Sequence, residues 1–199
     1  GVDIKHPDLL TCFKIIFILG YRCGLRRNEA LKLRMVDISG RSEIHLHIVD
    51  HEFRTLKTKN SERKIILNWF LSDNEMSLIR NWLHKKDSEN YSDFLFSIPD
   101  LQYTSLHEDV VFHNLHKIMR SVSGDPNMRF HHLRHSFATM TLLKLETTNY
   151  PAIKEFFKNS PRTYDWLSDG SNLHNKIFNC RQTTRKYLFL ICDIMGHSS

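Results

Sequence analysis

The stretch that decides the fold is RFHHLRHSFAT, residues 129–139. Within it, His131 and Arg134 are three residues apart, so they share one face if the stretch is helical. Apolar residues also recur there at helical spacing and predict a helix that begins near His131. The residues that this helix is expected to bury are Leu133, Phe137 and Met140. A histidine and an arginine on one helical face indicate an anionic ligand.

A metal site is the alternative interpretation of the same histidines. His131 and His135 are four residues apart, as in helical zinc pairs, and His132 is a third candidate ligand. The pair lacks the intervening glutamate of metalloproteases, and no carboxylate or thiol nearby supplies a further ligand. We therefore expect no metal here, and full activity in a chelator would exclude a metal-dependent hydrolase.

A second cationic motif lies near the start of the chain, GLRRNEAL at residues 24–31. Its glycine predicts a turn that places Arg26 at the start of a short helix over 26–33. The preceding residues predict a helix capped by Asp8, and their apolar positions surround most of its circumference, which indicates a central, buried element.

The hydrophobic period changes after Gly40 and predicts strands. Residues 44–49 alternate, and residues 53–56 and 63–67 flank the polar stretch 57–62, which has the composition of a hairpin tip. Helical periodicity returns in residues 72–83, 111–122 and 183–195. The sequence therefore predicts an α+β fold, mainly α-helical, with a small three-stranded antiparallel sheet.

Length and composition favour one soluble domain that binds a polyanion. The chain has 199 residues, 41% of them hydrophobic and 25% charged, with a formal net charge of +6. Its four cysteines form no close pairs, which predicts a reduced, cytoplasmic protein. The longest apolar runs are far shorter than the roughly 20 residues that cross a bilayer, so we expect no membrane association.

The order of these motifs resembles the catalytic domain of the tyrosine recombinases, the phage integrase family. The resemblance rests on the two motifs above, on the segments LKT (56–58) and RKIIL (63–67), and on MGHSS (195–199). It covers the chain from about Asp8 to its last residue, and it implies the corresponding mainly helical fold with one catalytic domain over 1–199.

The resemblance implies an enzyme of DNA integration and recombination that acts on double-stranded DNA of a mobile element. In such enzymes a tyrosine attacks a backbone phosphate and forms a 3′-phosphotyrosyl link, and no metal, cofactor or small-molecule substrate takes part. The residues that match the catalytic positions are Arg26, Lys57, His131, Arg134 and His197. Arg26 and Arg134 would clamp the phosphate, Lys57 would be the general acid, with Lys59 as a weaker candidate, and both histidines would hold the phosphate. The expected further DNA contacts are Arg27, Lys59, Arg63 and Lys64.

The sequence departs from the family in two places. Arg134 and His197 are farther apart than usual, so residues 146–181 are expected to be an insertion whose aromatic residues seat it on the domain. No tyrosine follows His197, and no N-terminal DNA-clamping domain precedes residue 1. We therefore expect this polypeptide to form no covalent DNA link, whereas the full-length protein should do so as a homotetramer on DNA. A non-catalytic DNA-binding relative and a type IB topoisomerase-like enzyme are the alternatives.

Overall fold

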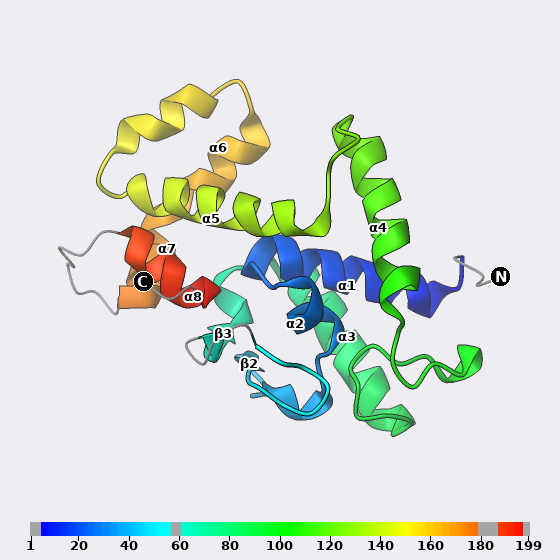
Figure 1. Ribbon diagram of the computed structural model, residues 1–199. Helices are drawn as coiled ribbons and strands as arrows, with labels where there is room; N and C mark the ends of the chain where they lie inside the picture. Colours follow the sequence, from blue (N-terminus) through cyan, green and yellow to red (C-terminus); the bar gives the residue numbers. More distant parts are fainter. Residues whose placement is uncertain (1–4, 57–60, 179–186, 197–199) are drawn as a thin grey trace.

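The computed structural model describes residues 5–56, 61–178 and 187–196 (Figure 1). Three residues with predicted roles, Lys57, Lys59 and His197, lie outside the described residues. None of the helices within the described ranges is long and apolar enough to span a membrane.

Two long helices pack against each other at the centre of the molecule, α1 (Pro7–Cys23) and α5 (Phe130–Glu146) (Figure 1). They approach closely at Gly20, where a Cβ atom would lie 2.5 Å from the ring of Phe130. Helices α3 (Asp73–Glu89) and α4 (Glu108–Ser123) pack against α1, whose Leu9, Cys12 and Ile16 are fully buried. The prediction of a central first helix is confirmed.

The predicted cap of α1 is wrong. His6 is the N-cap residue, because Pro7 suits the first helical position, where a missing N–H costs no hydrogen bond. Asp8 instead lies in the first turn and pairs with Lys85 of α3, at 2.6 Å between Oδ2 and Nζ.

The predicted three-stranded antiparallel sheet is confirmed, but one of its strands was assigned wrongly. The strands are β1 (Ile38–Ser39), β2 (His45–Ile48) and β3 (Arg63–Ile66), in that order, with Leu46 paired to both Ile38 and Ile65. Residues 53–56 form no strand of this sheet, because the Arg54 side chain is buried there. Its Nη1 donates to Asp37 Oδ2 at 3.0 Å and its Nη2 to the Val49 carbonyl at 2.8 Å.

Short elements connect these parts. Helix α2 covers Arg27–Leu31, and the 3-10 turns are η1 (Met35–Asp37), η3 (Leu67–Trp69) and η4 (Pro99–Leu101). After α5 the chain forms η5 (Pro151–Phe157), α6 (Pro161–Ser168) and α7 (Gly170–Phe178), and α8 (Tyr187–Met195) follows.

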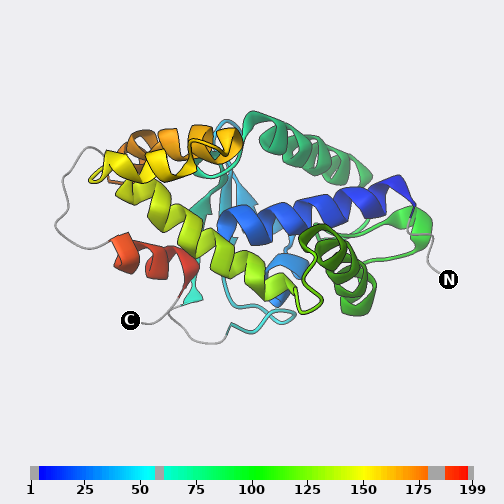
Figure 2. The same cartoon turned by 90° about the horizontal axis from the view of Figure 1, so that it is seen from above.

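The segment that contains η5, α6 and α7 packs beside the C-terminal half of α5, at the end far from α4 (Figure 2). Leu173 of α7 joins Phe137, Leu145, Ile191 and Met195 in a second apolar cluster, which ties α7 and α8 to α5. Trp166 packs over Lys144, whereas Phe156 is 86% exposed, so the predicted seating role fits only some of the aromatic residues.

Candidate active site

The turn between α1 and α2 places Arg26 at the surface end of the core, where its side chain is half-buried. Gly24 ends α1 with φ at 65°, a left-handed conformation that favours glycine, and a Cβ there would lie 2.5 Å from Phe137. Arg26 then precedes α2. Its Nη1 donates to Glu29 Oε1 at 2.7 Å, and its Nη2 donates to the Gly196 carbonyl at 3.1 Å.

Helix α5 places Arg134 beside this turn. Its side chain is buried, with Nη1 donating to the carbonyl of Gly24 and Nη2 to that of Met195. Burial lowers the pKa of Arg134 to about 10, with the positive charges of Arg26 and Arg63 acting in the same direction and Glu29 opposing them. The guanidinium remains charged at neutral pH.

Glu29 joins two arginines of this cluster, and the sequence analysis gave it no role. The buried carboxylate accepts from Arg26 and also from Arg63, whose Nη1 and Nη2 lie 3.1 and 2.8 Å from its oxygens. Burial alone would raise its pKa, but the hydrogen bonds and charge of Arg63, together with the Arg26 contacts, lower it to about 2. Glu29 is therefore ionised throughout the physiological range.

Arg63 lies inside the molecule, although the sequence analysis expected it to contact DNA. Its side chain is only 5% exposed, and besides Glu29 it donates from Nε to the Ile194 carbonyl at 2.7 Å and from Nη1 to the Ser61 carbonyl at 2.9 Å. These contacts connect β3 to α2 and α8. The Arg63 guanidinium thus donates to protein acceptors on several sides.

Three arginines thus converge on the C-terminal end of α8. Consecutive carbonyls of Ile194, Met195 and Gly196 accept from Arg63, Arg134 and Arg26 respectively. Cations at a helix C-terminus satisfy its carbonyls and the negative end of its dipole. This contact fixes where the chain leaves α8, directly before His197.

Three histidine rings cluster at the start of α5. The His131 ring centroid lies 4.0 Å from that of His132 and 5.9 Å from that of His135. His132 Nδ1 accepts from the Arg129 backbone N–H at 3.0 Å, which caps the helix. Burial lowers the pKa of His131, and the neighbouring His132, His135 and Arg129 lower it further. Its position one turn before Arg134 puts it on the same helical face.

The remaining predicted residues lie around this cluster. The Arg27 side chain is partly exposed, forms an ion pair with Glu108 and lies over the Phe112 ring at 4.5 Å. Lys64 is exposed on β3. An open hollow of about 380 Å³ lies beside the cluster, and its lining includes Arg26, Arg27, Thr55 and Leu56. Throughout the ranges that the structure covers, no three His, Cys, Asp or Glu side chains are grouped so as to hold a metal ion.

Comparison with known proteins assigns the class. The family model described as the phage integrase family matches residues 9–147, so the chain belongs to this family, the tyrosine recombinases. The resemblance inferred from the motifs is thereby confirmed. None of the curated proteins matches the chain.

Among solved structures, the chain is similar to XerH site-specific recombinase bound to difH substrate in a pre-cleavage complex. The TM-score is 0.51 at 22% identity, over 80% of this chain and 44% of that one. A post-cleavage complex of XerH with palindromic difH gives a TM-score of 0.47 at 20% identity, over 90% of this chain and 47% of that one. The chain thus spans less than half of that recombinase, and the likeness shows the fold.

Proposed function

We propose that this chain is the catalytic domain of an enzyme that cuts and rejoins DNA strands through a 3′-phosphotyrosyl intermediate. The observation that carries the proposal is the convergence of Arg26 and Arg134 on adjacent carbonyls at the end of α8. A guanidinium carries five N–H donors, and in the described part of the chain each of these two gives only some of them to protein acceptors. The remaining donors suit the nonbridging oxygens of a phosphate.

The proposed reaction balances without a metal or ATP. The tyrosine hydroxyl oxygen attacks phosphorus, His131 accepts its proton, and the P–O5′ bond breaks as Lys57 gives a proton to the leaving oxygen. A 5′-hydroxyl of the exchanged strand then attacks the phosphotyrosine and releases the tyrosine. His197 would hold the phosphate. Lys57 and His197 have these roles by their place in the family motifs.

None of the six tyrosines of the chain suits the nucleophile, because all of them precede His197. Tyr187 is buried at the start of α8, about 12 Å along the helix from the end that the arginines hold. We therefore propose that the nucleophile follows His197 in the full-length protein and that a polypeptide without it forms no covalent link.

The proposed partner is double-stranded DNA, with four copies acting together in the cytoplasm. Support comes from the formal net charge of +6, from the exposed Lys64 and partly exposed Arg27 near the cluster, and from the DNA present in the XerH complexes. Arg63 has a different proposed role from the one its sequence indicates: it positions Glu29 and α8 rather than contacting DNA.

The test uses the full-length protein on a nicked suicide duplex in EDTA, with denaturing gels to detect a protein–DNA adduct. We expect a metal-independent adduct that Arg134→Lys reduces by about 100-fold or more, because lysine cannot give paired donors to a phosphate. Lys14→Gln, at an exposed lysine of α1 outside the proposed DNA contacts, is the control and keeps the adduct. Stable DNA binding without any adduct would instead identify a non-catalytic DNA-binding relative.

A further inference from the structure

The first turn of α5, which carries His131, is held at its backbone by two histidine rings. The Arg129 N–H donates to His132 Nδ1 at 3.0 Å. The Phe130 N–H donates to His116 Nε2 at 3.1 Å. The first contact is local, because its two residues are three apart, whereas the second joins α5 to α4 across 14 residues of sequence. His116 is therefore the residue by which a separate helix holds the start of α5.

An imidazole is an unusual acceptor at a helix N-terminus. The usual acceptors there are the side-chain oxygens of Ser, Thr, Asp and Asn, which keep their lone pairs near neutral pH. A histidine ring nitrogen accepts only when it carries no proton, so this contact requires a neutral His116 with its proton on Nδ1. Protonation at Nε2 removes the acceptor and places a positive charge at the positive end of the helix dipole.

The surroundings of His116 favour this neutral form. The ring is partly buried on α4, with its centroid 6.2 Å from that of Phe112. Burial lowers the pKa of His116, and the charged or titratable groups that face it lower the pKa further. These groups are Arg120 on the same helix, Arg27 on α2, and Arg129 and His131 at the start of α5. The ring is therefore neutral at pH 7.5.

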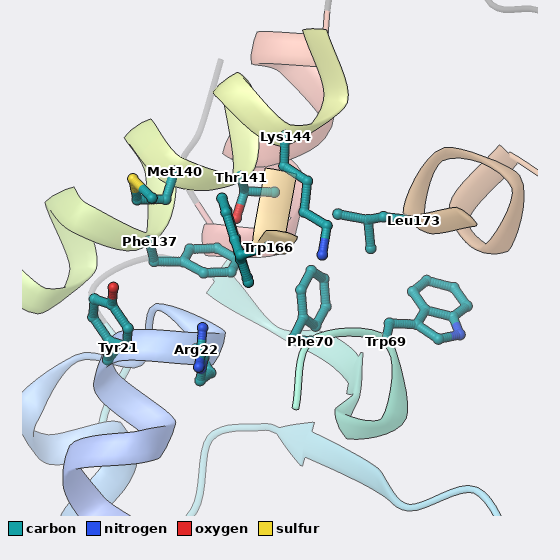
Figure 3. A pocket seen from close by; sticks show the side chains of 10 residues that line it. All are labelled: Tyr21, Arg22, Trp69, Phe70, Phe137, Met140, Thr141, Lys144, Trp166 and Leu173. Carbon is teal, nitrogen blue, oxygen red and sulfur yellow. The ribbon is translucent and has the colours of Figure 1, made fainter. Parts of the chain in front are cut away.

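The C-terminal half of α5 is fixed in a different way, by side-chain packing against α6 and α7. The α5 side chains in this packing are Phe137, Met140, Thr141 and Lys144 (Figure 3). Lys144 pairs with Asp169 at 3.1 Å and lies over the Trp166 ring at 4.8 Å. In the first turn, by contrast, the His131 side chain is exposed, so its position depends on how the backbone of that turn is held.

We propose that His116 is a positioning residue of the active site. Its neutral ring holds the Phe130 N–H and with it the first turn of α5, from which His131 reaches the tyrosine and the phosphate. Arg134 follows one turn later on the same helix. Protonation of His116 releases this turn, which makes the site sensitive to pH through a residue that acts only on the backbone of α5. The inference rests on the proposed function, because the site that His116 serves is the proposed one.

The first test concerns the contact itself and needs no DNA. NMR of the imidazole nitrogens at pH 7.5 should show a nonprotonated Nε2 and a protonated Nδ1 in His116. Hydrogen exchange should show a protected Phe130 amide, and the protection factor should fall as the pH is lowered from 7.5 to 5. His116→Phe should lower this factor by about tenfold, the effect of one hydrogen bond. His116→Gln offers an acceptor as many bonds from the backbone that does not titrate, so it should keep the factor within about threefold at both pH values.

The second test measures adduct formation by the full-length protein on the suicide duplex at saturating DNA. His116→Phe should slow the reaction by about tenfold or more while changing the Kd for DNA by less than about threefold. His116→Gln should restore the rate. Lys144→Met is the control, because it removes a buried cation from the far end of α5 and should lower stability without slowing adduct formation.

Three results would overturn the inference: a proton on Nε2 of His116 at pH 7.5, equal protection of the Phe130 amide in His116→Phe and His116→Gln, or an unchanged rate of adduct formation in His116→Phe. If the unsubstituted protein forms no adduct, the proposed function fails. The NMR and exchange measurements then still decide whether His116 holds the start of α5.

Discussion

Glu29 stabilises the fold through its negative charge, and its pKa determines the pH range over which this stabilisation is present. The folded-state pKa of about 2 lies below the ordinary value of 4.5, so the stabilisation is present above pH 4.5 and is lost as the pH falls toward 2. The difference corresponds to about 3 kcal/mol. We predict that Glu29→Gln lowers the free energy of unfolding at pH 7 by about this amount and flattens its dependence on pH between 5 and 2, measured by urea denaturation.

Glu62→Gln is the matched control for that measurement, because Glu62 is exposed one residue before Arg63. It should change the free energy of unfolding by less than about 0.5 kcal/mol. Equal effects of the two substitutions would contradict the assigned role of Glu29.

The sequence indicated Arg26 and Arg134 as candidate site residues, but it did not indicate Glu29, the acceptor that connects Arg26 to Arg63 of β3. The resemblance to the family implies the two arginines, because each lies in a short motif at the start of a helix, where local sequence is enough to place it. Glu29 and Arg63 are 34 residues apart, and their contact exists only because β3 lies beside α2. A local sequence pattern does not indicate a contact between residues so far apart. The sequence analysis therefore treated Arg63 as an exposed cation of a basic hairpin.

At the scale of elements, α8 is held by its last carbonyls, and this predicts different outcomes for two adjacent residues of β3. Arg63→Gln removes donors from Glu29 and Ile194, so we expect a loss of about 3 to 5 kcal/mol in unfolding free energy. Lys64→Gln should leave stability within about 0.5 kcal/mol and instead weaken DNA binding, making the slope of log K against log salt less negative by about 1. Thermal melts and DNA titrations over a salt series measure both, and a stable Arg63→Gln protein would contradict the assignment.

Elements with strong periodicity were predictable, and the error in the sheet has a physical cause. Helices α3, α4 and α5 follow their apolar spacing, with Ser72 and Glu75 forming the capping box of α3. Residues 53–56 look like a strand beside a hairpin tip, but burial of Arg54 against Asp37 draws them away from β3. An alternating hydrophobic pattern does not reveal that a cation is buried. The sheet therefore has the short β1 as a strand where the sequence predicted residues 53–56.

At the scale of the whole molecule, DNA affinity should depend on pH through the histidines at the start of α5. Burial and the neighbouring His132, His135 and Arg129 keep the pKa of His131 below 6.5, so its ring is neutral in the free protein at pH 7.5. A bound phosphate favours the charged ring, and binding is therefore coupled to proton uptake. We predict that affinity for DNA rises as the pH falls from 7.5 to 6, in titrations at constant salt. His131→Asn should flatten this dependence, whereas His84→Asn on the exposed side of α3 should not. An unchanged pH profile in His131→Asn would show that the ring does not meet a phosphate and would remove it from the proposed site.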